Sequence, residues 1–100
     1  MKTIKVGGHE YTVVVKPIDK DGDLASCDYN TATITIDQTI TVQTIRESAF
    51  LHEIMHACNS TFGYEGIEHG LLDSLAEQLY QVLKDNNLLN QHALDRILKT

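Results

Sequence analysis

Residues 50–60 read FLHEIMHACNS, and this stretch places His52, Glu53 and His56 inside a run of apolar residues. The apolar side chains around these three polar ones recur at the three- and four-residue spacing of an α-helix. They cover so much of the helix circumference that we expect a central helix, packed on more than one side. We expect it to end near Gly63, because glycine favours the C-terminal end of helices.

The chain before this helix has the pattern of short β-strands. Residues 3–18, TIKVGGHEYTVVVKPI, predict two strands on either side of Gly7-Gly8. Residues 24–37, LASCDYNTATITID, predict two more strands joined by a turn at positions 29–31. In the last of them, TATITID at positions 31–37, threonine alternates with isoleucine, which predicts one buried and one polar face.

Two further helices are expected after the central one, over about residues 68–85 and 90–98. The core face of the first is marked by Leu71, Leu72, Leu75, Leu79, Val82 and Leu83. Strands followed by helices predict an α+β fold. We therefore expect one domain, residues 1–100, in which a small antiparallel sheet of three to four strands packs on the histidine-bearing helix and two further helices.

Composition narrows the class of protein. The chain of 100 residues has a net charge of −6, with scattered acidic residues and no cluster of lysine or arginine, which argues against a nucleic-acid partner. Its apolar runs are too short to cross a membrane, and its first residues contain no secretory signal, so we expect a cytoplasmic protein without a membrane partner. Cys27 and Cys58 fit no metal or redox spacing and are interpreted as small, reduced core residues.

The order His52-Glu53-x-x-His56 is the HExxH pattern of zinc hydrolases. Residues four apart lie on the same side of a helix, so the two imidazoles can bind one Zn²⁺ ion. Glu53 lies about 100° further round the helix and can accept a proton from a water on the metal. Imidazole also suits nickel, copper and iron, so the pattern does not fix the metal.

A catalytic zinc normally has three protein ligands and a water. The region after Gly63 offers Glu65, Glu68, His69 and Asp73. We expect His69 as the third metal ligand, because it lies at the edge of the core face, with Asp73 one turn on to hold the ring N–H of a metal-binding histidine. Glu68, in line with the leucines, is the alternative third ligand.

The segment HEIMH at 52–56, followed by His69-Gly70 and Asp73, resembles the zincin metallopeptidases. His69-x-x-x-Asp73 is similar in spacing to the third-ligand region of the gluzincins, which have Glu where this chain has His. His69-Gly70 is similar to the downstream motif of the SprT-like proteases, whose basic zinc-ribbon tail is missing here. The resemblance extends to small metallopeptidase-like proteins of phages and prophages, and covers the chain to about Asn87.

The resemblance implies a peptide or protein substrate, cleaved by metal-activated water with Glu53 as general base. It also implies that TATITID is the sheet-edge strand beside the cleft, where substrate backbone would pair. Tyr64 is a candidate hydrogen-bond donor to the developing oxyanion. Other interpretations remain: hydrogen-bonded core histidines, a zinc site without turnover, an interaction module on a zincin-like fold, and a DNA-linked protease.

Overall fold

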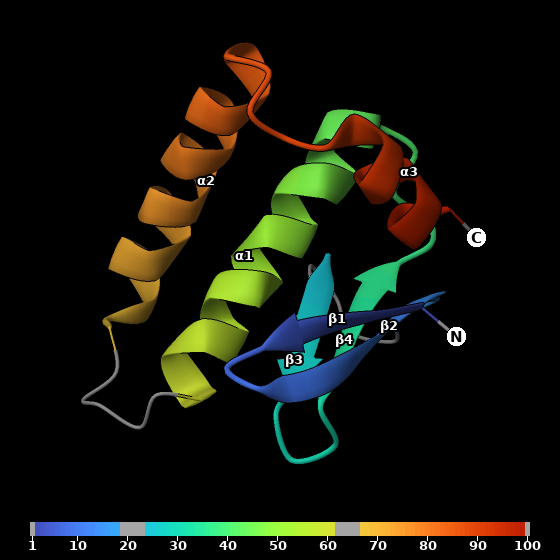
Figure 1. Ribbon diagram of the computed structural model, residues 1–100, viewed down its shortest axis with the longest axis vertical. Coiled ribbons are helices and arrows are strands. Elements are labelled where there is room, and N and C mark those ends of the chain that lie inside the picture. Colours follow the sequence, from blue (N-terminus) through green and yellow to red (C-terminus); the bar gives the residue numbers. More distant parts are fainter. Residues whose placement is uncertain (1, 19–23, 62–66, 100) are drawn as a thin grey trace.

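The computed structural model describes residues 2–18, 24–61 and 67–99 and shows an α+β fold, as the sequence predicts (Figure 1). In chain order the elements are β1 (Lys2–Val6), β2 (His9–Lys16), β3 (Ala25–Asp28), β4 (Thr33–Asp37), α1 (Gln43–Thr61), α2 (His69–Asp85) and α3 (Gln91–Leu98). The four strands form one sheet in the order β1-β2-β4-β3. Among the described residues, no helix combines the length and apolar character that a membrane span requires.

Each of the two hairpins follows from local sequence. β1 and β2 are antiparallel, and Val6 pairs with His9 across Gly7 and Gly8. Both glycines have positive φ, 58° and 82°, the backbone conformation that two-residue hairpin turns favour. β3 and β4 are also antiparallel, and Asp28 pairs with Thr33 across a short turn.

The sheet is mixed, and here the expectation of an antiparallel sheet was wrong. β2 and β4 run parallel, with Val13 opposite Ile34 and Val15 opposite Ile36. This pairing places β4 inside the sheet, where Ile34 and Ile36 are fully buried. Burial of these two side chains favours β4 over the more polar β3 as the inner strand.

The expected position of TATITID at the sheet edge was therefore also wrong. β4 lies between β2 and β3, and the two edge strands are β1 and β3. Both edge strands contact α1, and β3 is the one whose residues line a cavity together with the histidines of that helix.

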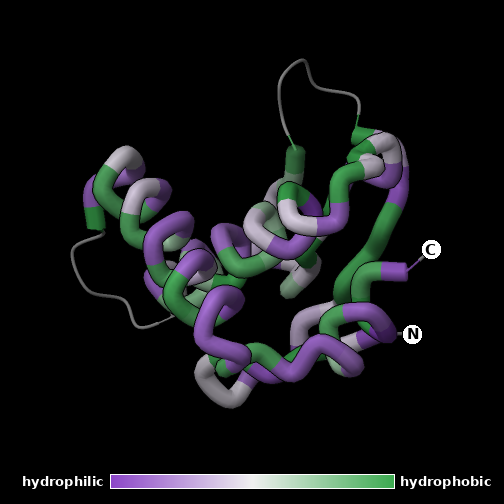
Figure 2. The backbone as a smooth tube through the Cα atoms, turned by 90° about the horizontal axis from the view of Figure 1, so that it is seen from above, coloured by the Kyte–Doolittle hydropathy of each residue, from purple (hydrophilic) through white to green (hydrophobic). Residues whose placement is uncertain are grey.

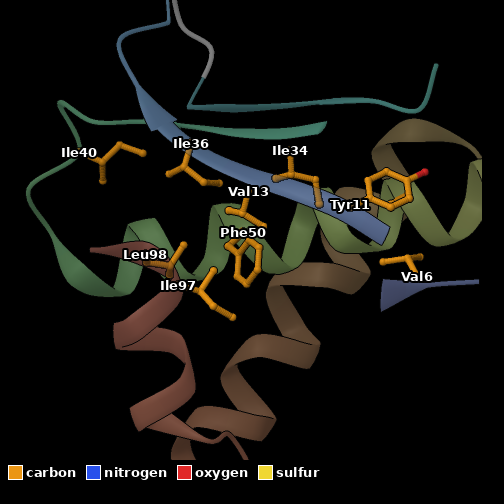
Figure 3. Packing of buried hydrophobic residues seen from close by; sticks show 10 residues of the cluster. Val6, Tyr11, Val13, Ile34, Ile36, Ile40, Phe50, Ile97 and Leu98 are labelled. Carbon is orange, nitrogen blue, oxygen red and sulfur yellow. The ribbon is translucent and has the colours of Figure 1, made fainter. Parts of the chain in front are cut away.

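The core lies between the sheet and the helices (Figure 3). Tyr11, Val13 and the two β4 isoleucines face Phe50 of α1. The last helix closes one end of this cluster with Ile97 and Leu98. α1 is thus the central helix, as its apolar circumference predicts.

α2 lies at the margin of the molecule in both views (Figures 1 and 2). It packs against α1 through a narrow strip centred on Leu72 and Ala76. Leu71 is 60% exposed. Leu75, Leu79 and Val82 are exposed as well, so the predicted core face of this helix was wrong at these four positions. α2 packs against α1, and a single neighbouring helix is too narrow to cover the whole apolar arc of α2.

Candidate metal centre

α1 places His52 and His56 one turn apart on the face that it turns to α2. Their Nε2 atoms are 2.9 Å apart, and the ring centroids are separated by 4.7 Å. Both side chains are partly exposed. Burial, with the neighbouring His52 and His69, lowers the pKa of His56, although Asp73 opposes the change. Neutral imidazole, which this shift favours, is the form that binds metal ions.

The first turn of α2 brings His69 and Asp73 to the same point. The His69 ring stacks against His56 at a centroid distance of 4.9 Å and an interplanar angle of 27°. His69 Nε2 lies 3.2 Å from Asp73 Oδ2, and His56 Nε2 lies 3.7 Å from Asp73 Oδ1. The other neighbour of Oδ1 is His52 Nε2, with which it is in direct contact.

These four residues can hold a metal ion. Each offers one ligand atom, and all four atoms lie within 4.8 Å of one another. Ligand distances of about 2.0–2.1 Å in a tetrahedral site put the ligand atoms roughly 3.3 Å apart. Separations of 2.9, 3.2 and 3.7 Å within the cluster lie near that value, although His52 Nε2 and Asp73 Oδ1 are closer than this and the group as a whole extends to 4.8 Å.

Asp73 lies on the Nε2 side of the three histidine rings. Its contacts are with the Nε2 atoms of all three histidines, not with Nδ1. Oδ1 is also buried, and no described residue gives it a hydrogen bond of acceptable geometry. Asp73 was expected to hold the N–H of the ring nitrogen that does not bind the metal. The structure shows a different contact for Asp73.

Glu68, the alternative third ligand, lies outside the cluster. It is the N-cap of α2, and its carboxylate accepts hydrogen bonds of 2.9 Å from the backbone N–H groups of Gly70 and Leu71. These hydrogen bonds lower the pKa of Glu68. The side chain is exposed and caps its own helix, in contrast to the inward orientation expected from the leucine pattern. Glu65 and Tyr64 lie outside the described residues.

Glu53 is 7% exposed and lines the same cavity as the histidines. The cavity has a volume of about 760 Å³ and lies between α1, α2 and β3. Cys27 of β3 also lines it, and its thiol pKa is raised to about 11 by burial and by the charges of Glu53 and Asp28. A thiol with that pKa remains protonated at neutral pH when no metal ion is bound.

The remaining wall of the cavity is largely apolar. β3 and its flanks contribute Leu24, Ala25 and Tyr29, while the first turns of α1 contribute Ile45 and Ala49. Leu24, Tyr29 and Ile45 are large and exposed, so their apolar surface is available to a ligand.

A buried carboxylate at Glu47 fixes α1 relative to α2 and α3. Glu47 is 1% exposed, and its Oε1 accepts hydrogen bonds from Tyr80 Oη at 2.6 Å and Lys84 Nζ at 3.0 Å, both on α2. Oε2 accepts from Gln43 at 2.9 Å and from Gln91 of α3 at 2.5 Å. Burial alone would raise the pKa of Glu47, but these four hydrogen bonds outweigh it and lower the pKa to about 2.

The prediction of site residues from sequence missed this network. The feature of the sequence that indicates this network is Glu47, a glutamate in the apolar stripe of α1, three residues before Phe50 and seven before Ile54. A buried charge at such a position requires several partners. They come from three helices, so the sequence does not identify them.

Comparison with protein-family models, with curated proteins and with solved structures found no match to this chain. What the protein does must therefore be inferred from the cluster, from Glu53 and from the cavity that they line.

Proposed function

We propose that this protein is a zinc-dependent metallopeptidase in which His52, His56 and His69 bind the metal and Glu53 is the general base. The observation that carries the proposal is the convergence of three imidazoles from two helices, with a buried glutamate lining the same cavity. Three histidine ligands, with a carboxylate nearby as general base, are a combination suited to a hydrolytic zinc site.

Zinc in such a site lowers the pKa of a bound water and polarises a carbonyl oxygen. Glu53 follows His52 directly on α1 and lines the same cavity as the histidines, but it is not a member of the cluster. From there it can accept the proton that the water releases and pass it to the leaving amine.

A peptide substrate is supported by the strand that borders the cavity. β3 is an edge strand, and Ala25 and Cys27 line the cavity along it. The N–H and C=O groups on an open strand edge can pair with an extended backbone. Leu24 and Ile45 line the cavity and are exposed, which supports a substrate with a large apolar side chain.

One experiment tests both halves of the proposal. Zinc content by elemental analysis is measured on the wild type, His52→Ala and Glu53→Gln, together with cleavage of a mixed peptide library followed by mass spectrometry. We expect Glu53→Gln to keep its zinc and to lose cleavage by a factor of about 10²–10⁴, because only the proton acceptor is removed. Cleavage that persists in Glu53→Gln would exclude this mechanism.

A metal site without turnover is the second candidate, and the position of Asp73 favours it. With Asp73 included, the cluster offers four protein donors, the number found in structural zinc sites. In that case the wild type would bind zinc tightly and cleave no peptide in the library. Unfolding of the wild type on removal of zinc by a chelator would be the positive result for this alternative.

A further inference from the structure

We propose that Asp73 is itself a metal ligand, and that in the resting protein it fills the coordination position that water needs. This inference rests on the proposed metal site at His52, His56 and His69 and adds a regulatory feature to it. The site would be closed by its own chain until a substrate displaces the carboxylate.

The first support is the side of the rings on which Asp73 lies. A carboxylate that only orients a metal-bound histidine accepts a hydrogen bond from the ring nitrogen that does not bind the metal. Asp73 instead contacts Nε2 of His52, His56 and His69. These are the same nitrogens that converge on one another, so the carboxylate occupies the position of a ligand.

The second support is the buried oxygen. Asp73 Oδ1 is shielded from solvent, and among the described residues its nitrogen neighbours, Nε2 of His52 and of His56, do not form a hydrogen bond of normal geometry with it. Buried carboxylate oxygens are nearly always satisfied by a donor or a cation. A cation between Oδ1 and the three Nε2 atoms satisfies this oxygen and separates atoms that otherwise crowd one another.

The third support is that Asp73 has room to leave. Its side chain is 38% exposed, although Oδ1 itself is buried, so solvent reaches part of the carboxylate. Zinc can expand from four to five ligands during a reaction. If zinc is bound, an incoming carbonyl or water would therefore be able to replace the Asp73 carboxylate, which would turn toward solvent. The same residues thus account for a metal site that is full at rest and open when occupied by substrate.

The test is anion binding to the Co²⁺-loaded protein, in which the visible absorption of Co²⁺ reports its ligands. Azide is titrated into the wild type, Asp73→Ala and Glu77→Ala. Glu77 is the matched control, because it is an exposed carboxylate one turn further along α2 that lines the cavity but is outside the cluster. We expect azide to bind Asp73→Ala at least about tenfold more tightly than the wild type or Glu77→Ala.

Loss of metal affinity alone would not separate the two roles of Asp73, because removing an orienting carboxylate also weakens metal binding by about 10–100-fold. Azide affinity does separate them, because opening a coordination position raises it at least about tenfold, whereas Glu77→Ala measures the effect of removing a nearby negative charge alone. Equal or weaker azide binding by Asp73→Ala would overturn the inference while leaving the three-histidine site intact. A wild type that binds neither Co²⁺ nor Zn²⁺ would overturn both.

A second measurement covers the case in which Asp73→Ala does not fold. In a crystal of the zinc-loaded wild type, a Zn–Oδ distance of about 2.0–2.2 Å supports the inference. A water in that position, with the carboxylate beyond roughly 3 Å, overturns it.

Discussion

Tyr80 of α2 donates a 2.6 Å hydrogen bond to the buried carboxylate of Glu47 in α1. This contact joins the two helices that carry the histidines. His52 and His56 come from one helix and His69 from the other, so the geometry of the cluster depends on how firmly α1 and α2 are held together.

Replacing Glu47 by Gln should destabilise the protein by about 2–4 kcal/mol, because the four donors around the carboxylate lose a charged acceptor in a buried site. Urea unfolding followed by circular dichroism measures the change. Glu77→Gln, at an exposed position of α2, is the control and should change stability by less than about 0.5 kcal/mol. A similarly small effect at Glu47 would show that the network does not hold the helices together.

The carboxylate of Glu47 should also make the stability of the protein depend on pH in the acidic range. The pKa of Glu47 falls from 4.5 to about 2 on folding, so its contribution is fully present above pH 4.5 and is lost as the pH falls toward 2. The difference in unfolding free energy between wild type and Glu47→Gln should therefore shrink by roughly 3 kcal/mol across that window. Unfolding titrations at several pH values measure it, and a difference that does not vary with pH would contradict the assignment.

His69→Ala and Glu68→Ala should separate two neighbouring residues with different roles. We expect His69→Ala to lose most of its zinc, because it removes one of the converging Nε2 atoms. Glu68→Ala should keep its zinc and lose about 0.5–2 kcal/mol of stability, because it removes the cap of α2. Elemental analysis and thermal unfolding of both variants make the comparison. Full zinc in His69→Ala together with loss in Glu68→Ala would transfer the ligand role to Glu68.

Leu72→Ala and Leu71→Ala should test which face of α2 is buried. Leu72 is 1% exposed, so its truncation should cost about 2–5 kcal/mol. Leu71 is 60% exposed and should cost less than about 1 kcal/mol. Denaturant unfolding of the two variants measures how much stability each of them loses. Equal costs would indicate that the outer leucines of α2 are covered in solution.

The sequence predicts most of the elements because their causes are local. The strand pairs on either side of Gly7-Gly8 and of the turn after Asp28 follow from alternation and turn residues, and the structure confirms them. The expected limits of the last two helices, 68–85 and 90–98, agree with α2 and α3 to within one residue. Their N-caps, Glu68 and Asn90, lie immediately before the helices.

The sheet order and the buried face of α2 could not be predicted in the same way. The segment TATITID does not indicate that β2 runs parallel beside it. That pairing depends on which arrangement buries Ile34 and Ile36 best. The leucines of α2 give an apolar arc wider than the surface that α1 offers, so periodicity alone does not say which part is covered.

By itself, the sequence determined that His52 and His56 share one face of a helix with Glu53 beside them, because a spacing of four residues fixes direction within an α-helix. The tertiary structure decided the rest of the centre. It brought His69 and Asp73 close to His52 and His56. It also made Glu68 the N-cap of α2 and gave Glu47 its hydrogen-bond partners. Those contacts join residues far apart in the chain, and their geometry depends on how α2 docks against α1, which no local spacing specifies.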